Sequence, residues 1–170
     1  MSIVNARHYL EKAINLATRH HLGQVDLESE PYILHPLRVM FAVRTKYPQN
    51  YDAQTVAVLH DIIEDTTITV KDLRDSSFSD IIIEALVLLT HDKAVDYKEY
   101  IIKVSQNPTT KIVKIADLND NLALNRMPYY NEKKDLSRIQ KYIRAWMFLH
   151  GRFDEEFYRS HWSIDTLKAE

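Results

Sequence analysis

The chain contains no cysteine, and glycine occurs only twice among its 170 residues. Without cysteine there is no disulfide and no thiolate zinc site, so the redox state of the compartment does not constrain the fold. With two glycines and five prolines, the chain also lacks the residues that an all-β fold needs for its many tight turns. These absences exclude the disulfide-rich classes and argue against a β-sandwich or β-barrel.

A dominant charge and a long apolar run are also missing. Lysine and arginine number 22 against 24 acidic residues, which leaves no basic field for nucleic acid. The opening residues "MSIVNARHYL" lack the apolar run of a signal peptide, and nothing in the chain approaches a membrane span. We therefore expect a cytoplasmic protein that binds neither nucleic acid nor membrane, with residues 1–170 forming a single domain around one core.

Apolar residues recur at helical spacing along nearly the whole chain, which predicts an all-α fold of about eight helices. The first helix should run to about His21, and Asp52 should cap the helix that contains "AVLHDIIEDT". Thr69–Asp72 resembles a capping box, and Asn107 precedes a proline at a favourable helix start. The β-branched run in "SSFSDIIIEALVLLT" would suit a strand, but its length and caps favour a helix.

The stretch "AVLHDIIEDT", from Ala57 to Thr66, combines core residues with a histidine and three acids. On one regular helix with His60 as zero, Glu64 falls near about 40° and Asp61 near about 100°. Asp65 falls near about 140°, and apolar residues fill the other side. One interpretation is a solvated acidic face of an amphipathic helix.

The other interpretation is a metal site. No lysine or arginine occurs between Lys46 and Lys71, so these acids lack a local counter-charge, and a bound cation would remove their repulsion. The pair His60-Asp61 offers an imidazole nitrogen and a carboxylate oxygen, a mixture that borderline divalent metals accept.

More ligands must then come from elsewhere in the chain. His35 begins the preceding helix, and Asp117 lies on a later helix with Lys114 and Asn121 on nearly the same face. The alternatives are a capping or packing role for His35 and a surface ion pair between Asp117 and Lys114.

Three segments carry a family resemblance: "PYILHPLRV", "AVLHDIIEDT" and "KIADLNDN" occur in this order. Together they resemble the HD-domain phosphohydrolases, and within them the (p)ppGpp hydrolase branch, which comprises the SpoT/RelA hydrolase domain and small stand-alone relatives. The segment "HHLGQ" is similar to a motif that precedes the first metal histidine in that branch. The motifs cover about Arg19 to Asn121, most of the chain.

The resemblance implies an all-α HD fold and one divalent metal, in the first place Mn²⁺, with Fe²⁺ or Zn²⁺ as alternatives. The positions that match metal ligands are His35, His60, Asp61 and Asp117. Glu64 and Asp65 match an acidic pair that orients or deprotonates the attacking water. Asn121 matches a substrate-contacting asparagine, and Lys114 matches a lysine common in the same motif.

One loop departs from the family pattern. The hydrolase branch usually has "GQxRKxGxPYI", whereas this chain has "GQVDLESEPYI", with Asp26 and Leu27 in place of the basic pair and Glu28 and Glu30 after them. An acidic loop should repel a highly charged tetraphosphate. Three other residues could compensate by binding phosphate or stacking on a base, namely Arg19, Arg138 and Tyr142. The alternative for the last two is a solvated arginine and a half-buried tyrosine.

The sequence therefore predicts a metal-dependent phosphohydrolase acting on a phosphorylated nucleotide, first of the (p)ppGpp pyrophosphohydrolase type that removes pyrophosphate. Two alternatives stay open: an HD-type nucleoside-monophosphate phosphatase, and a nucleotide-binding regulatory module with reduced catalysis. The apolar faces would permit a homodimer.

Overall fold

In a computed structural model of the chain, residues 3–123 and 132–160 are described. These residues form ten helices and no strand, which confirms the all-α prediction and adds two helices to the expected eight. Their bounds are α1 (Ile3–His20), α2 (Leu34–Lys46), α3 (Tyr51–Leu59), α4 (Ile62–Asp65), α5 (Val70–Asp75), α6 (Asp80–Leu89), α7 (Tyr97–Ser105), α8 (Pro108–Asn121), α9 (Glu132–Leu149) and α10 (Glu155–Ser160). No helix among them is long and apolar enough to cross a membrane.

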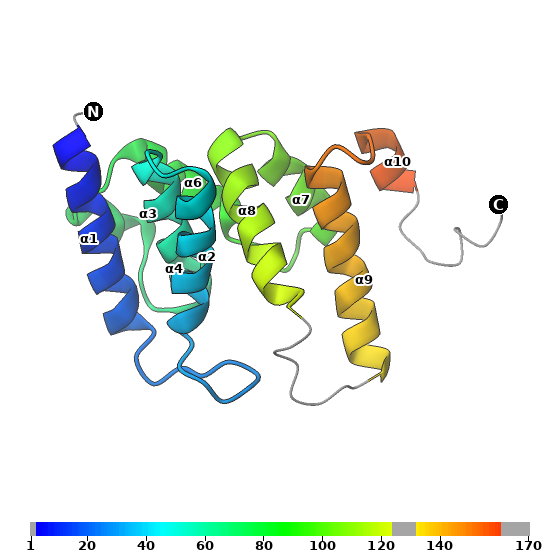
Figure 1. Ribbon diagram of the computed structural model, residues 1–170, viewed down its shortest axis with the longest axis horizontal. Coiled ribbons are helices and arrows are strands. Elements are labelled where there is room, and N and C mark those ends of the chain that lie inside the picture. The colour runs from blue at the N-terminus through cyan, green and yellow to red at the C-terminus, as the bar shows by residue number, and fades with distance from the viewer. Residues whose placement is uncertain (1–2, 124–131, 161–170) are drawn as a thin grey trace.

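Helix α3 lies at the centre of the core. Its residues from Ala53 to Leu59 are all buried, as expected of a helix that is apolar on nearly every side. It packs against α1, α2, α6 and α8, and Figure 1 shows α1, α2 and α8 arranged around it, with α9 beyond α8. A residue at the end of α3 is therefore held by the core.

Several helix starts follow the predicted chemistry. Thr69 and Asp72 form a reciprocal capping box, and the side chain of Asn107 caps α8. The segment with the β-branched run forms α6, as predicted. The expected cap at Asp52 is wrong, because Asn50 accepts the Ala53 N–H at 3.0 Å and α3 already begins at Tyr51. Asp52 instead lies in the first helical turn, where its charge suits the helix dipole.

The acidic stretch does not form one helix, so the prediction of a single regular helix through it is wrong. Helix α3 ends at Leu59 and α4 begins at Ile62, since Asp61 has φ −98° and ψ 0°, in the bridge region between helix and strand. Because of this break, His60 Nε2 lies 3.0 Å from Asp61 Oδ2, although a regular helix would separate the two side chains by about 100°. The break aims both side chains at one point.

Candidate functional site

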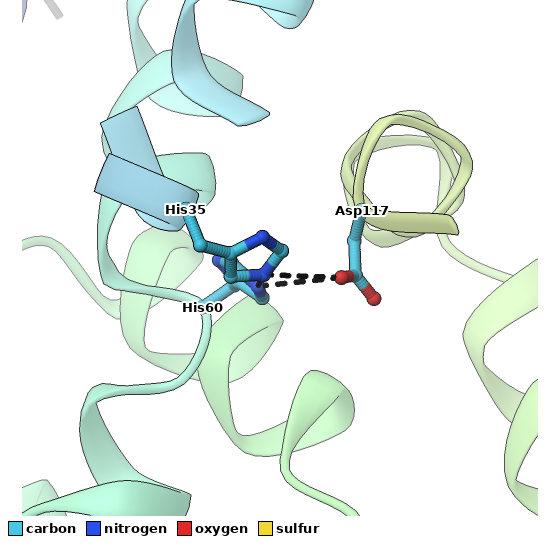
Figure 2. A group of neighbouring side chains, drawn as sticks. All are labelled: His35, His60 and Asp117. Atoms are coloured by element: carbon cyan, nitrogen blue, oxygen red, sulfur yellow. Dashed lines mark hydrogen bonds and ion pairs between the residues drawn. The ribbon is translucent and has the colours of Figure 1, made fainter. Parts of the chain in front are cut away.

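Two histidines and an aspartate from separate helices converge inside the molecule. His35 comes from α2, His60 follows α3, and Asp117 comes from α8; all three side chains are buried. Asp117 Oδ1 lies 3.3 Å from His35 Nε2 and 3.7 Å from His60 Nε2, as Figure 2 shows. The two Nε2 atoms are 3.2 Å apart. One ligand atom from each residue lies within 4.8 Å of the others, so the three residues could hold a metal ion.

Asp61 completes a group of four, which we call the histidine–aspartate group: His35, His60, Asp61 and Asp117. Asp61 Oδ2 is 3.0 Å from His60 Nε2 and 3.6 Å from His35 Nε2. The structure therefore brings together the four residues that the sequence predicted as ligands. Two imidazoles and two carboxylates form a donor set that suits a borderline divalent ion.

The outer nitrogens of both histidines have partners of their own. His60 Nδ1 lies 2.8 Å from the Ala57 carbonyl oxygen, which requires a proton on Nδ1 and directs Nε2 towards Asp61 and Asp117. His35 Nδ1 lies 2.6 Å from Asp120 Oδ2. Such outer hydrogen bonds fix the ring orientation and raise the basicity of the inward nitrogen.

Sequence reasoning missed the role of Asp120. Its carboxylate accepts two hydrogen bonds from Arg38, at 2.8 and 3.1 Å, in addition to the contact with His35. Burial alone would raise the pKa of Asp120, but its bonds to His35 and Arg38 lower the pKa to about 2. The only hint in the sequence is spacing, since Arg38 and Asp120 each lie three residues after a predicted ligand.

The charges of the histidine–aspartate group depend on one another. Burial disfavours ionised His60, yet the charge of Asp61 and the bonds to both aspartates raise its pKa well above the ordinary value. Burial likewise opposes ionisation of Asp61, and the charge of His60 lowers its pKa to about 2. The two carboxylates therefore create a field that stabilises positive charge between them.

Asp117 is held from its other side by α8 itself. Lys114 Nζ lies 2.8 Å from Asp117 Oδ2, and the Asn121 amide donates to Oδ1. Burial would lower the pKa of Lys114, but the charge of Asp117 raises the pKa well above its ordinary value. The pair with Lys114 forms, but Asp117 is buried rather than at the surface as the alternative required, and Oδ1 faces the histidines.

Glu64 and Asp65 follow on α4 and are exposed. Glu64 lines the cleft beside the histidine–aspartate group and accepts the His91 backbone N–H at 3.0 Å. Tyr32 connects Asp65 to the histidine–aspartate group, because its hydroxyl lies 2.5 Å from Asp61 Oδ2 and 3.2 Å from Asp65 Oδ2. Burial and the charge of Asp61 raise the pKa of Asp65.

The "HHLGQ" motif has a structural explanation. Gln24 donates from Nε2 to the Asp65 carbonyl oxygen at 2.7 Å, and its Oε1 lies 2.7 Å from His21 Nδ1. His21 is buried, and its ring lies 5.0 Å from that of Tyr32. The motif therefore ties the segment between α1 and α2 to α4.

A cleft of about 550 Å³ opens above the group. Among the predicted substrate-binding residues, four line it: Lys114, Asn121, Arg138 and Tyr142. Arg19 is exposed in the last turn of α1 and does not line the cleft. Sequence reasoning did not identify the further aromatic and basic lining residues Tyr97, Tyr100 and Lys141.

Residues 25–30, which we call the acidic loop, border the same cleft through their first four members. Val25 and Pro31 form an isolated bridge, and Ser29 has a positive φ of 64°. The loop is closed by Asp26, whose Oδ1 accepts the N–H groups of Glu28 at 2.9 Å and Glu30 at 3.0 Å. Asp26 and Glu28 line the cleft, whereas Glu30 does not.

Comparisons with known proteins agree with this architecture. No family model matches the chain. A GTP pyrophosphokinase from Streptomyces coelicolor is 24% identical over 167 residues, which are 93% of this chain and 19% of that protein. The bifunctional (p)ppGpp synthase/hydrolase SpoT of Escherichia coli is 29% identical over 123 residues, 66% of this chain and 17% of that protein. The chain thus spans less than a fifth of the length of these curated relatives.

A solved structure, described as a metazoan orthologue of SpoT that hydrolyses ppGpp, matches with a TM-score of 0.67 and 20% identity. The match covers 91% of this chain and 97% of that one, so both share one helical fold. The chain is therefore similar in fold to a SpoT orthologue and in sequence to (p)ppGpp synthases and hydrolases, which confirms the resemblance carried by its three motifs.

Proposed function

We propose that the protein is a metal-dependent phosphohydrolase acting on a phosphorylated nucleotide, of the (p)ppGpp type that removes pyrophosphate. The observation that carries the proposal is the convergence of His35, His60 and Asp117 beside a cleft that His35 and Asp117 line. The relatives named as (p)ppGpp hydrolases and the fold shared with a ppGpp-hydrolysing protein support it.

The donor set fits one divalent ion, for which we propose Mn²⁺, held by His35, His60, Asp61 and Asp117. When bound, such an ion would act as a Lewis acid that polarises a phosphoryl oxygen and lowers the pKa of a water molecule. The chain prepares this position itself, because Asp120 and Ala57 orient the two imidazoles and Lys114 orients Asp117.

We assign Glu64 as the base that takes the proton from the attacking water, because its carboxylate lines the cleft next to the group. Asp65 orients the water together with the Tyr32 hydroxyl, which spans Asp61 and Asp65. The water oxygen attacks the phosphorus attached to the ribose, and the bond from that phosphorus to the ribose oxygen breaks. The ribose oxygen leaves as a hydroxyl after it takes the proton that Glu64 removed from water, and the pyrophosphate released carries the water oxygen.

For the rest of the nucleotide, Asn121 and Arg138 would contact phosphate, with Lys114 nearby, and the Tyr142 ring would stack on the base. Arg19 is not included, since it does not line the cleft. A cytoplasmic location, a single domain and a homodimer stay predictions from the sequence.

The test is release of pyrophosphate and phosphate from a panel of ppGpp, pppGpp, NADPH and simple nucleotides with Mn²⁺. Wild type should release pyrophosphate from at least one guanosine bearing a 3′-diphosphate, and Asp61→Ala should abolish that release. Equal, metal-independent turnover by both proteins would overturn the proposal. Release of phosphate from monophosphates alone would instead identify the nucleoside-monophosphate phosphatase, and tight binding without turnover would identify the regulatory module.

A further inference from the structure

The lysines and arginines that line the cleft come from three helices and not from the acidic loop, since residues 25–30 contain neither residue type. Among the described residues they are Arg38 of α2, Lys114 of α8, and Arg138 and Lys141 of α9. A phosphate binds most strongly to a cation whose charge no carboxylate already balances. The partners of these four side chains therefore indicate where a phosphate of the substrate would lie.

Three of the four cations already have a carboxylate partner. The pairs are Lys114 with Asp117 at 2.8 Å, Arg38 with Asp120 at 2.8 Å, and Arg138 with Asp135 at 2.9 Å. The charge of each is balanced within the protein, so an anion would gain less by binding there.

Lys141 is different, because it has no carboxylate partner in the part of the chain that the structure describes. Its Nζ lies 4.6 Å from the centre of the Tyr97 ring and 5.3 Å from the centre of the Tyr142 ring. Such cation–π contacts hold the ammonium group in place, but they leave its net charge unbalanced. Burial, with the charges of Lys114 and Arg138, lowers the pKa of Lys141. An anion at Nζ would oppose both effects, since it favours the charged form.

Lys141 lies in the same cleft as the histidine–aspartate group but contacts a different part of it. Helix α9 packs against α7 and α8, and the Tyr97 ring next to Lys141 lies 5.8 Å from the Tyr100 ring. The Tyr100 ring centre lies 5.3 Å from Lys114 Nζ, which pairs with Asp117. Two tyrosine rings and a second lysine thus connect Lys141 to the reacting position. A phosphate at Lys141 would not be the one at the histidine–aspartate group.

We propose that Lys141 binds a phosphate of the substrate other than the one being hydrolysed, and that it thereby selects nucleotides with two separate phosphate groups. This inference rests on the proposed function, since it takes a phosphorylated nucleotide as the occupant. The Tyr97 and Tyr142 rings position the ammonium group for this contact, and the proposed stacking of Tyr142 on the base places the nucleotide next to it.

The test compares two substrates that share the base and the scissile group. Guanosine 3′-diphosphate is prepared with a 5′-hydroxyl or with a 5′-diphosphate, and pyrophosphate release with saturating Mn²⁺ gives kcat/KM for each. Wild type should prefer the 5′-diphosphate. Lys141→Met should lower this preference by about 10-fold to 100-fold, the usual effect of losing a hydrogen bond between charged groups. Methionine keeps an unbranched side chain that packs against both rings.

Two further variants and a binding measurement define the cause. Lys141→Arg keeps the positive charge and should retain the preference. Lys103→Met removes a lysine from an exposed position on α7 outside the cleft, and should behave like wild type. Calorimetry of both compounds with Mn²⁺-loaded Glu64→Gln protein, with and without Lys141→Met, gives affinities without turnover. The affinity for the 5′-diphosphate should depend on Lys141 more strongly than that for the 5′-hydroxyl compound.

Equal kcat/KM for the two substrates in wild type would overturn the inference and leave the proposed function intact. So would an equal loss for both substrates in Lys141→Met, or the same loss of preference in Lys103→Met. Absence of turnover for both compounds, with an affinity difference that depends on Lys141, would remove the proposed function and keep the phosphate contact. Absence of both turnover and that difference would overturn the two proposals together.

Discussion

The histidine–aspartate group and the acidic loop face the same cleft, but they are fixed to the rest of the protein very differently. His60 follows the fully buried residues Val58 and Leu59. The Nδ1 atoms of His35 and His60 are each held by a hydrogen-bond partner. In the loop, by contrast, Val25 and Leu27 are exposed by 61% and 70%. The loop is anchored at its ends, through Gln24 and the Val25–Pro31 bridge.

This difference separates a precisely positioned group from a loosely held one. Groups that hold a metal and activate water need positions defined to a fraction of an ångström, which a packed core provides. An exposed loop with few packed contacts tolerates side-chain movement. The two regions should therefore respond differently to substitution.

Replacing Glu64 with glutamine should have the largest effect. Loss of a positioned base typically lowers turnover by about 10²–10⁴-fold, whereas Mn²⁺ affinity should stay as in wild type. Steady-state kinetics of pyrophosphate release, with calorimetry for the metal, measure both quantities. Glu84→Gln is the control, because Glu84 is exposed on α6 away from the cleft. Turnover within about threefold of wild type would show that another group takes the proton.

The core beside His60 and the acidic loop should also differ in their contribution to the free energy of unfolding. Leu59→Ala removes a side chain with 0% exposure beside His60 and should destabilise the fold by roughly 2–5 kcal/mol. Leu27→Ala, at 70% exposure, should change stability by no more than about 0.5 kcal/mol. Urea denaturation followed by circular dichroism measures both values. Similar losses in the two variants would contradict the contrast between core and loop.

Asp120→Asn should weaken metal binding although Asp120 is not itself a predicted ligand. The carboxylate holds the outer nitrogen of His35 at 2.6 Å, and replacement of such outer partners typically costs about 10–100-fold in metal affinity. Titration calorimetry with Mn²⁺ measures the change, and activity should return at higher metal concentration. Asp75→Asn, which alters an exposed ion pair with Lys71, should bind the metal like wild type. An unchanged affinity would limit Asp120 to a structural role.

The smallest effect is a pH dependence of stability. Asp120 has a pKa of about 2 in the folded protein, against about 3.9 in an unfolded chain. A lowered carboxyl pKa stabilises the fold above the unfolded value, and this stabilisation is lost as the pH falls through 4 towards 2. The advantage of metal-free wild type over Asp120→Asn should be about 1–2 kcal/mol at pH 6 and roughly half of that at pH 3. Urea denaturation at both pH values tests this, and a constant difference would contradict it.

Local patterns in the chain allowed much of the fold to be predicted. The capping box at Thr69, the Asn107 cap and the helix over the β-branched run all depend on residues within a few positions of one another. The four convergent residues were found through their donor chemistry and the motif resemblance. The predicted cap at Asp52 was wrong because Asn50, two residues earlier, accepts the capping hydrogen bond from the Ala53 N–H. Both residue types are good caps, and the sequence alone did not show which of them begins the helix.

What the sequence could not provide is geometry between distant segments. Arg38 and Asp120 are 82 residues apart, and their pairing behind His35 depends on the packing of α2 against α8. The break at Asp61, which brings His60 and Asp61 to one point, is a local change that the helical periodicity of the stretch conceals.

By itself, the sequence determined the helical class, several helix ends and the residue types able to hold a metal and activate water, since these follow from periodicity, capping chemistry and donor atoms. The tertiary structure decided which of these side chains converge, which cations are already paired, and that Asp26 and Glu28 rather than Glu30 border the cleft. Distances between segments far apart in the chain arise from the packing of whole helices, and no local pattern encodes them.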